Sequence, residues 1–324
     1  MIVKDILYSL FQVLSRKFHR PRVPIGAILM LHKIDVPDEK GIWYNQHLKV
    51  SPSTIEEMAD YAKRHNCRFV SLDEMEEAIR KKKNVRRWIA VTLDDGYQDN
   101  YLNGAPVFRK CGIPFTIYVC TKMVNKEMLY WWEILEQLVL ENDRIELSDG
   151  RVYDCSTKEA KEKSFLDIRE IILTLPQNDL VNHLRLLFSN YDLDYNYGND
   201  KLGLSWKEIT ELAKEPLCTI GNHTYSHSAF IGQTDTEIEQ DICCAGNEMK
   251  EHVGIDMQHF AFPFGEASAV SQHDIQLVKG LGFKTSATTK DGFVCYGTDP
   301  LELPRIFVTE KNWKQVIDRI IANC

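Results

Sequence analysis

Residues 87–99 read RWIAVTLDDGYQD, and this stretch decides the expected fold. Its first seven residues form a nearly continuous apolar run, as expected of a strand that is buried on both faces. Two adjacent carboxylates, Asp94 and Asp95, and then Gly96 follow at the carboxyl end of that strand. Other segments with the length and composition of strands are residues 26–32, 68–72, 114–119, 217–221, 259–263, 284–289 and 305–308.

Helical patterns separate these strands. Residues 51–66 offer Ser53 as an N-cap with Glu56 three residues later, which is the spacing of a capping box. Residues 234–254 begin on capping residues and end at Gly254, which predicts another helix. This alternation of strands and helices predicts βα units and a parallel sheet, most simply closed into a barrel.

The stretch from about residue 126 to residue 201 breaks the alternation. It contains the helical pattern YWWEILEQLVLEN, a hairpin that turns at Asp149 and Gly150, and further helical segments at 158–175 and 177–189. Regular βα units resume at Leu204. We therefore predict one α/β barrel domain over residues 26–324 that carries a mainly helical insertion.

Composition and charge argue against several classes of protein. A net charge of −8 and the lack of a long basic stripe argue against a nucleic-acid-binding surface. Nine cysteines without a CxxC pair resemble neither a disulfide framework nor a zinc ribbon. Reduced thiols in a cytoplasmic protein fit this pattern best.

Residues 1–25 predict an amphipathic helical extension in place of a signal peptide. Lys4 and Asp5 interrupt the apolar segment, and no small-residue cleavage site follows it. No run in the sequence reaches the roughly 18 apolar residues that a membrane span needs. The helix either packs on the domain or rests on a membrane surface, so peripheral contact is the most that we expect. The sequence indicates no particular oligomeric state.

Two histidines, His223 and His227, follow another apolar strand, and their spacing of four predicts both rings on one face of a helical turn. Adjacent aspartates diverge, so one of the pair at 94–95 can ligate a metal while the other accepts a proton. A carboxylate and two imidazoles, with open positions for water, describe a hydrolytic site for one divalent metal ion. Zn²⁺ is the default, and Co²⁺, Ni²⁺ or Fe²⁺ would also fit.

Five ordered motifs resemble those of the polysaccharide deacetylases with a NodB-homology domain, carbohydrate esterase family 4. TLDDG (92–96) is similar to the family's T-F-D-D-G motif, and HTYSH (223–227) is similar to its H-[S/T]-x-x-H motif. Similar pieces are also found in ILMLHKI (28–34), FAFPFGE (260–266), and TTKDGF (288–293) with LPRI (303–306). The resemblance covers residues 26–310 apart from the insertion.

The resemblance implies an incomplete (β/α)7 barrel of the NodB-homology type that binds one divalent metal. It implies hydrolysis of an acetyl group from an amino sugar or, less often, from a sugar hydroxyl. By position, Asp94 would be the general base, and Asp95, His223 and His227 would be the metal ligands. The backbone N–H of Phe264 would meet the negative charge that develops on the tetrahedral oxygen.

Two features of the family have no clear counterpart. Many members carry an arginine in the third motif that orients the base, whereas this chain offers only His259 or nothing there, and Arg305 is the candidate substitute. No histidine follows His273, so the family's late histidine is missing and the general acid is unassigned. His32 either reaches the site or has a structural role, and His47 is expected at the surface or in packing.

Aromatic residues near the motifs are candidates for stacking on sugar rings. Tyr97 and Tyr225 lie next to the metal residues and are the expected substrate contacts. Trp131 and Trp132 either stack on a ligand or bury the insertion against the barrel.

Three classes of function fit the sequence. The first is a metal-dependent hydrolase that removes acetyl groups, most readily N-acetyl, from a bacterial surface or capsular polysaccharide or its precursor. An acetylated glycan is then the expected partner. The second is a hydrolase of another amide C–N bond on the same barrel. The third is a non-catalytic glycan-binding relative, which the presence of all four metal and base positions disfavours.

Overall fold

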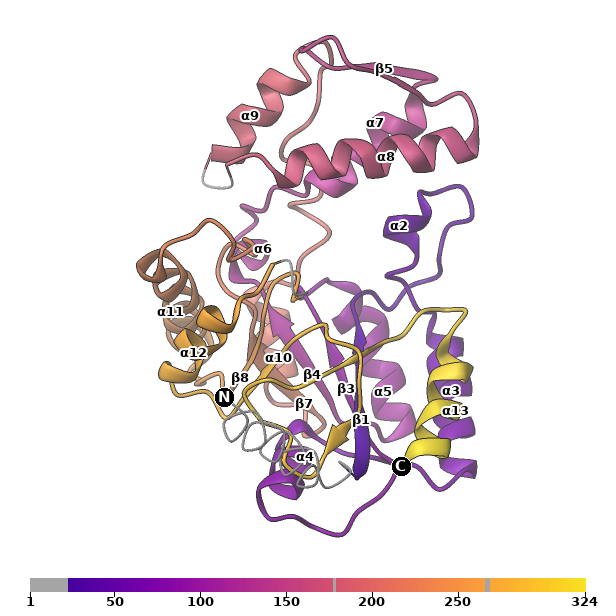
Figure 1. Cartoon of the computed structure of the whole chain (residues 1–324), viewed down its shortest axis with the longest axis vertical. Coiled ribbons are helices and arrows are strands. Elements are labelled where there is room, and N and C mark those ends of the chain that lie inside the picture. Colours follow the sequence, from indigo (N-terminus) through magenta and orange to yellow (C-terminus); the bar gives the residue numbers. More distant parts are fainter. Residues whose placement is uncertain (1–22, 177–178, 266–268) are drawn as a thin grey trace, which may run out of the picture.

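The structure is a computed structural model that describes residues 23–176, 179–265 and 269–324. A strongly curled sheet lies at its centre, with parallel strands in the order β1-β3-β4-β7-β8-β9 (Figure 1). Each of these strands coincides with a segment that is predicted as a strand from the sequence. Their bounds are β1 Pro24–Leu31, β3 Trp88–Leu93, β4 Phe115–Val119, β7 Cys218–Asn222, β8 His259–Ala261 and β9 Thr285–Ala287.

A short segment near the carboxyl terminus bridges the two ends of this sheet. The strand β11 (Ile306–Phe307) pairs in parallel with β1, and an isolated parallel bridge joins Ala287 of β9 to Leu303. Residues 303–308 therefore cross the gap between the first and the last parallel strand. The curled and incompletely closed sheet confirms the predicted α/β barrel.

Two further strands pair with β3 and with β1 of this ring. The segment 68–72, predicted as a strand, pairs over only two residues as β2 (Arg68–Phe69), because β4 takes the same edge of β3 from Val91 onward. The strand β10 (Val294–Cys295) runs antiparallel to β1.

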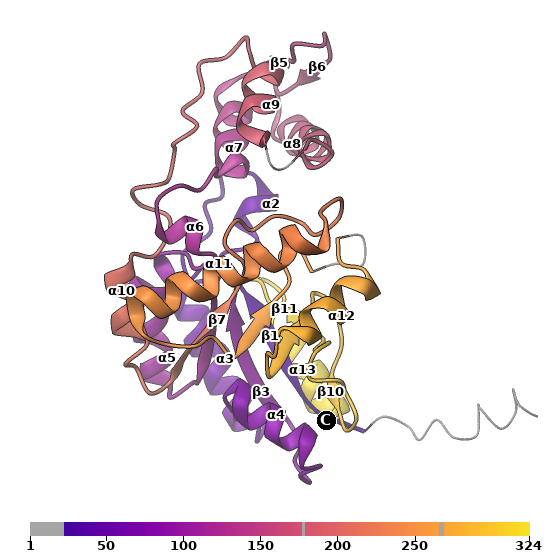
Figure 2. The ribbon, with the colours of Figure 1, turned by 90° about the vertical axis from the view of Figure 1, so that its left-hand side faces the viewer.

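Alternation along β3 decides which side chains enter the barrel. Ile89, Val91 and Leu93 pack in the cluster that faces the outer helices, whereas Ala90 belongs to the cluster inside the barrel. Asp94, four residues after Ala90, shares its face and is directed inward. Helices cover the outer face of the sheet (Figure 2). Around the barrel the helices are α3 Pro52–Arg64, α4 Leu72–Arg80, η1 Asn100–Gly104, α5 Ala105–Cys111, α6 Thr121–Val124, α10 Trp206–Leu212, α11 Asp235–Val253, α12 Gln272–Gly280 and α13 Trp313–Asn323.

The observed N-caps agree with one predicted helix start and differ from another. The prediction of Ser53 as the N-cap of α3 is wrong, because the helix begins two residues earlier with Ser51 as its cap and Pro52 in its first turn. Proline suits the first turn, where its missing N–H would have no helical partner. Helix α11 begins in a capping box at Thr234 and ends at Gly254, as predicted.

The segment that breaks the alternation forms a lobe above the carboxyl ends of the strands (Figures 1 and 2). It has its own hydrophobic cluster, to which Leu135, Ile145, Phe165 and Leu184 belong. The predicted hairpin turns through Gly150, whose φ of 85° favours glycine. The elements of the lobe are α7 Trp131–Glu141, β5 Arg144–Glu146, β6 Val152–Asp154, α8 Lys158–Leu173 and α9 Leu180–Leu187.

Glu136 connects this lobe to the short helix α2 (Trp43–Gln46), which follows the first strand. Its carboxylate is 5% exposed and accepts hydrogen bonds from the Ile42 N–H (2.8 Å), Asn45 Nδ2 (2.7 Å) and Gln46 Nε2 (3.0 Å). These bonds satisfy a buried charge with three donors, so α2 is held firmly against α7. Side chains of α2 thereby reach the mouth of the barrel.

Of the helical extension predicted over residues 1–25, residues 1–22 lie outside the part of the chain that the structure describes, whereas Pro24 and Ile25 already belong to β1. Among the described residues, no helix combines the length and the apolar character that a bilayer crossing requires.

Candidate metal centre

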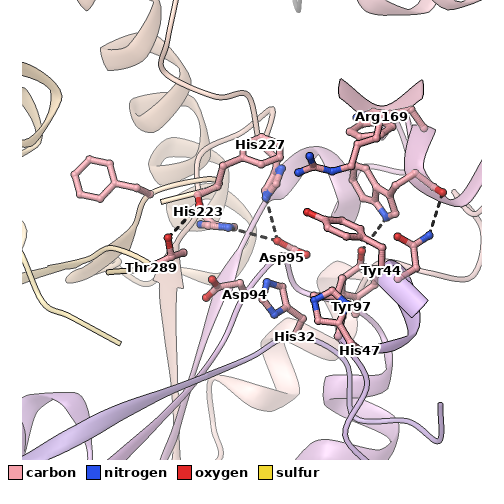
Figure 3. Close-up of a pocket in the computed structure, with 16 residues that line it drawn as sticks. His32, Tyr44, His47, Asp94, Asp95, Tyr97, Arg169, His223, His227 and Thr289 are labelled. Carbon is pink, nitrogen blue, oxygen red and sulfur yellow. Dashed lines mark hydrogen bonds and ion pairs between the residues drawn. The ribbon is translucent and has the colours of Figure 1, made fainter. Parts of the chain in front are cut away.

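Asp94 and Asp95 follow β3 directly and point in different directions (Figure 3). The backbone turns sharply here, because Asp95 has a φ of 75° and Gly96 a φ of 87°. Asp94 keeps the inward direction of the strand, while Asp95 faces the two histidines. The tight turn gives the adjacent carboxylates different neighbours, as the sequence predicts.

His223 and His227 follow β7, but they do not lie on a helix. The prediction of a helical turn is wrong, because Thr224 and His227 have φ values of 63° and 57°. Side chains fold the loop instead: Asn222 Oδ1 accepts from the Thr224 N–H (2.8 Å), and Thr224 Oγ1 accepts from the His227 N–H (3.0 Å). This turn brings the two imidazole centroids to 4.9 Å from each other.

The two imidazoles meet the carboxylate of Asp95 inside the mouth of the barrel. Asp95 Oδ1 lies 3.1 Å from His227 Nε2 and 3.4 Å from His223 Nε2, and the three ligand atoms lie within 4.8 Å of one another. His223 Nδ1 lies 2.8 Å from the Ala261 carbonyl, which can only accept, so Nδ1 carries the proton and Nε2 offers a lone pair.

These residues fit a divalent cation. Asp95 Oδ1 is buried and accepts no hydrogen bond among the described residues, so its charge lacks the donors that a buried carboxylate needs. Burial acts to raise the pKa of Asp95, but His227 and His223 outweigh it and hold the pKa well below its ordinary range. An ionised carboxylate beside two imidazole nitrogens is a donor set that suits divalent metals such as zinc.

Asp94 is paired with Arg305 in a buried two-pronged contact. Arg305 Nη1 donates to Asp94 Oδ1 (2.6 Å) and Nη2 donates to Oδ2 (2.8 Å), while the whole arginine is 0% exposed. Its Nε donates to the Thr288 carbonyl (2.9 Å), which fixes the guanidinium plane. Burial acts to raise the pKa of Asp94, but the charges of Arg305 and His223 and the hydrogen bonds from Arg305 together outweigh it, and the pKa is lowered.

The structure thus brings Arg305, and not His259, to Asp94. His259 is fully buried at the start of β8, where Nδ1 lies 2.8 Å from Thr285 Oγ1 and Nε2 lies 3.6 Å from Asp73 Oδ1. Arg305 precedes β11, whose pairing with β1 brings it beside the end of β3.

The three candidate ligand residues line a cavity together with Asp94, Tyr97 and Phe264. Tyr97 is 1% exposed, and its hydroxyl accepts from Trp132 Nε1 (3.2 Å). Phe264 has a φ of 60°, and its ring centroid lies 5.0 Å from that of His227. Tyr225, predicted to contact the substrate, does not line this cavity. Its side chain turns away, and its hydroxyl donates to Glu127 Oε2 (2.8 Å).

Several lining residues were not found from the sequence. Tyr44, Asn45, His47 and Arg169 complete the wall of the cavity, although the sequence predicts His47 at the surface or in packing. These residues reach the cavity because hydrogen bonds of Glu136 hold α2 against the lobe. No local sequence motif predicts this contact between distant segments. Trp131 and Trp132 also belong to the wall, as does His32, whose Nδ1 is buried without a partner among the described residues.

A barrel with an aspartate and two histidines at the carboxyl ends of its strands defines a candidate metal-dependent hydrolase. The chain belongs to the polysaccharide deacetylase family, because the model of that family matches residues 81–148 and 177–286. No curated protein sequence matches the chain significantly.

Solved structures of low sequence identity share the fold. The deacetylase PplD of Streptococcus pyogenes, in complex with acetate, is 16% identical with a TM-score of 0.61, over 92% of this chain and 98% of that one. IcaB from Ammonifex degensii is 18% identical with a TM-score of 0.61, over 92% and 97%. A de-N-acetylase from Aggregatibacter actinomycetemcomitans is 12% identical with a TM-score of 0.57, over 90% and 99%. The strongly curled sheet of this chain is therefore of the NodB-homology type.

Proposed function

We propose that this protein removes acetyl groups, most readily N-acetyl groups, from a bacterial surface or capsular polysaccharide or its precursor. The observation that carries the proposal is the largely buried cluster of Asp95, His223 and His227 beside Asp94, to which Arg305 donates two hydrogen bonds. Membership of the polysaccharide deacetylase family supports an acetylated glycan as the substrate. The name of the Aggregatibacter enzyme, which shares the fold, supports the N-acetyl preference.

The roles of the residues follow from their positions. A divalent cation bound by Asp95 and the two histidines would acidify a water molecule and polarise the acetyl carbonyl. Asp94 would accept a proton from the attacking water, because it is held ionised by Arg305 and lines the same cavity. Arg305 does not line the cavity, so its role is to orient Asp94 and keep it ionised.

The carbonyl oxygen of the substrate gains negative charge as water attacks. The N–H of Phe264, in a segment whose left-handed backbone reaches the cavity wall, would donate to that oxygen. Trp132 would present aromatic surface to a sugar ring, and the buried Tyr97, whose hydroxyl accepts from its indole N–H, would hold it in place at the cavity wall. Zn²⁺ is the metal that we propose, because it favours mixed nitrogen and oxygen ligands.

The direct test is acetate release by the zinc-loaded protein from acetylated oligosaccharides, with free amine measured in parallel. Acetate and amine in equal amounts would support N-deacetylation, and acetate without amine would show an O-acetyl preference. A panel of non-sugar amides serves as the comparison. Hydrolysis of those amides without acetate release from any sugar would refute the proposal.

A further inference from the structure

One charged side chain in the wall of the cavity has no role in the chemistry described above. Arg169 is the one lysine or arginine among the described residues that line the cavity. The acidic residues of the wall are Asp94 and Asp95, of which Asp94 is already paired with Arg305. Neither of these two carboxylates lies within ion-pair distance of Arg169, so its positive charge has no partner in the wall of the cavity.

The structure holds this guanidinium in a defined orientation. Arg169 extends from α8, its side chain is 12% exposed, and its guanidinium carbon lies 4.6 Å from the centroid of the Tyr44 ring. Figure 3 shows the guanidinium pointing into the cavity, on the side of His227. Stacking on an aromatic ring occupies the face of a guanidinium and leaves its N–H edges for hydrogen bonds.

Partners within the protein use little of that capacity. Among the described residues, Glu170 is the one carboxylate within ion-pair distance of Arg169, and it takes Nη1 alone (2.6 Å). The side chain of Glu170 is 70% exposed, so water screens its charge strongly. A largely buried arginine whose N–H groups face a cavity is arranged to bind an anionic group of a ligand.

We infer that the substrate carries an anionic group, a carboxylate or a phosphate, on the acetylated sugar or its neighbour, and that Arg169 binds it. This inference rests on the proposed function and narrows its substrate class to acidic glycans. A planar guanidinium matches the two oxygens of a carboxylate or phosphate in a bidentate contact. The shared chemistry is the anion, and the test separates its two sources.

A purely structural role for Arg169 would be to tie α8 to Tyr44. The same lobe offers a matched control, because Arg185 lies over the ring of Tyr195 at 5.4 Å and does not line the cavity. An arginine that only stacks on a tyrosine affects all sugars equally when it is replaced. An arginine that binds an anion affects only the charged sugars.

The experiment compares N-acetylglucosamine with its 6-phosphate, its 1-phosphate and its 6-carboxylate. Binding is measured calorimetrically on the metal-depleted protein, and acetate release is measured on the zinc-loaded protein. The wild type should bind at least one anionic sugar about tenfold or more tightly than the neutral sugar, as expected of a charge-assisted hydrogen bond. Arg169→Gln should remove this difference, Arg169→Lys should keep part of it, and Arg185→Gln should leave it intact.

The outcomes separate the two ideas. Equal binding of neutral and anionic sugars by the wild type, or an anion preference that survives in Arg169→Gln, would overturn the inference. Acetate release from the neutral sugar without charge discrimination would leave the deacetylase in place. Acetate release from no sugar would count against the deacetylase, while the binding arm would still decide the role of Arg169. A preference for the carboxylate over both phosphates, or the reverse, would identify the anion.

Discussion

Replacing Arg305 by methionine should remove the partner of a buried carboxylate and should cost both stability and activity. Asp94 is 3% exposed and receives two guanidinium hydrogen bonds, of 2.6 and 2.8 Å, which methionine cannot supply. Breaking a buried ion pair from one side costs about 3–5 kcal/mol, because the remaining charge is left uncompensated. The free energy of unfolding, measured in urea at pH 7, should fall by that amount.

The change should also appear in the pH dependence. In the wild type Arg305 lowers the pKa of Asp94, so its contribution to stability is present above the pKa of an unfolded aspartate, about 3.9, and is lost as pH falls through the lower folded value. In Arg305→Met, burial remains and the arginine is gone, so the pKa of Asp94 should rise. The acid limb of kcat/KM should then move to higher pH.

A surface pair provides the matched control. Arg319 also donates through two nitrogens to Asp291, at 3.3 and 2.8 Å, but these side chains are 44% and 61% exposed. Arg319→Met should cost less than about 1 kcal/mol. Adding Asp94→Asn to Arg305→Met should recover part of the lost stability, since it removes the unpaired charge. Equal stability losses at the two arginines, or an unmoved acid limb in Arg305→Met, would refute the reasoning.

Three further predictions concern single side chains. His227→Ala should lose zinc, measured by mass spectrometry of the native protein, whereas His47→Ala should keep it, because His47 lines the cavity without meeting the carboxylate of Asp95. Asp94→Asn should keep the metal and slow acetate release by roughly 10²–10⁴-fold, and Asp95→Asn should lose metal affinity; the reverse result would exchange the two roles. Burial raises the pKa of Asp99 to about 6, so ionising this carboxyl lowers the free energy of unfolding as pH rises from about 4 through 6. Asp99→Asn should make the free energy of unfolding less dependent on pH over that window, and an unchanged slope would contradict this assignment.

Much of the barrel could be predicted because parallel strands buried on both faces leave long apolar runs in the sequence. The strand before Asp94 is such a run, and it fixes the end of the barrel at which the carboxylates lie. The N-caps of the helices are harder to predict from the sequence than the strands. Ser53 and Glu56 have the spacing of a capping box, but Pro52 fits the first turn of the helix and Ser51 takes the cap.

The details of the site depend on contacts that no local pattern encodes. The spacing of His223 and His227 suits a helix, yet the side chains of Asn222 and Thr224 fold the segment into a loop, and Tyr225 turns away from the cavity. The choice between His259 and Arg305 as the partner of the base depends on which strand pairs with β1.

The wall of the cavity could not be predicted from the sequence either, because it also depends on contacts between distant segments. Its outer part comes from α2 and from α8, which lie more than a hundred residues apart in the chain. Helix α8 belongs to the lobe, and α2 is bonded to the lobe. Glu136 accepts the hydrogen bonds that connect α2 to α7 of the lobe. Nothing in the sequence distinguishes it from the other acidic residues of predicted helices. Arg169 could be assigned to the cavity only once this packing was known.

The proposed deacetylase activity depends on one metal ion, bound by Asp95, His223 and His227. The most direct measurement is a titration of the metal-depleted protein with Zn²⁺ while acetate release from an acetylated oligosaccharide is followed. We predict no acetate release without metal, then a linear rise that stops at one equivalent of zinc per chain. Acetate release that survives complete removal of the metal, or none at full zinc occupancy with neutral and acidic acetylated glycans, would contradict the account.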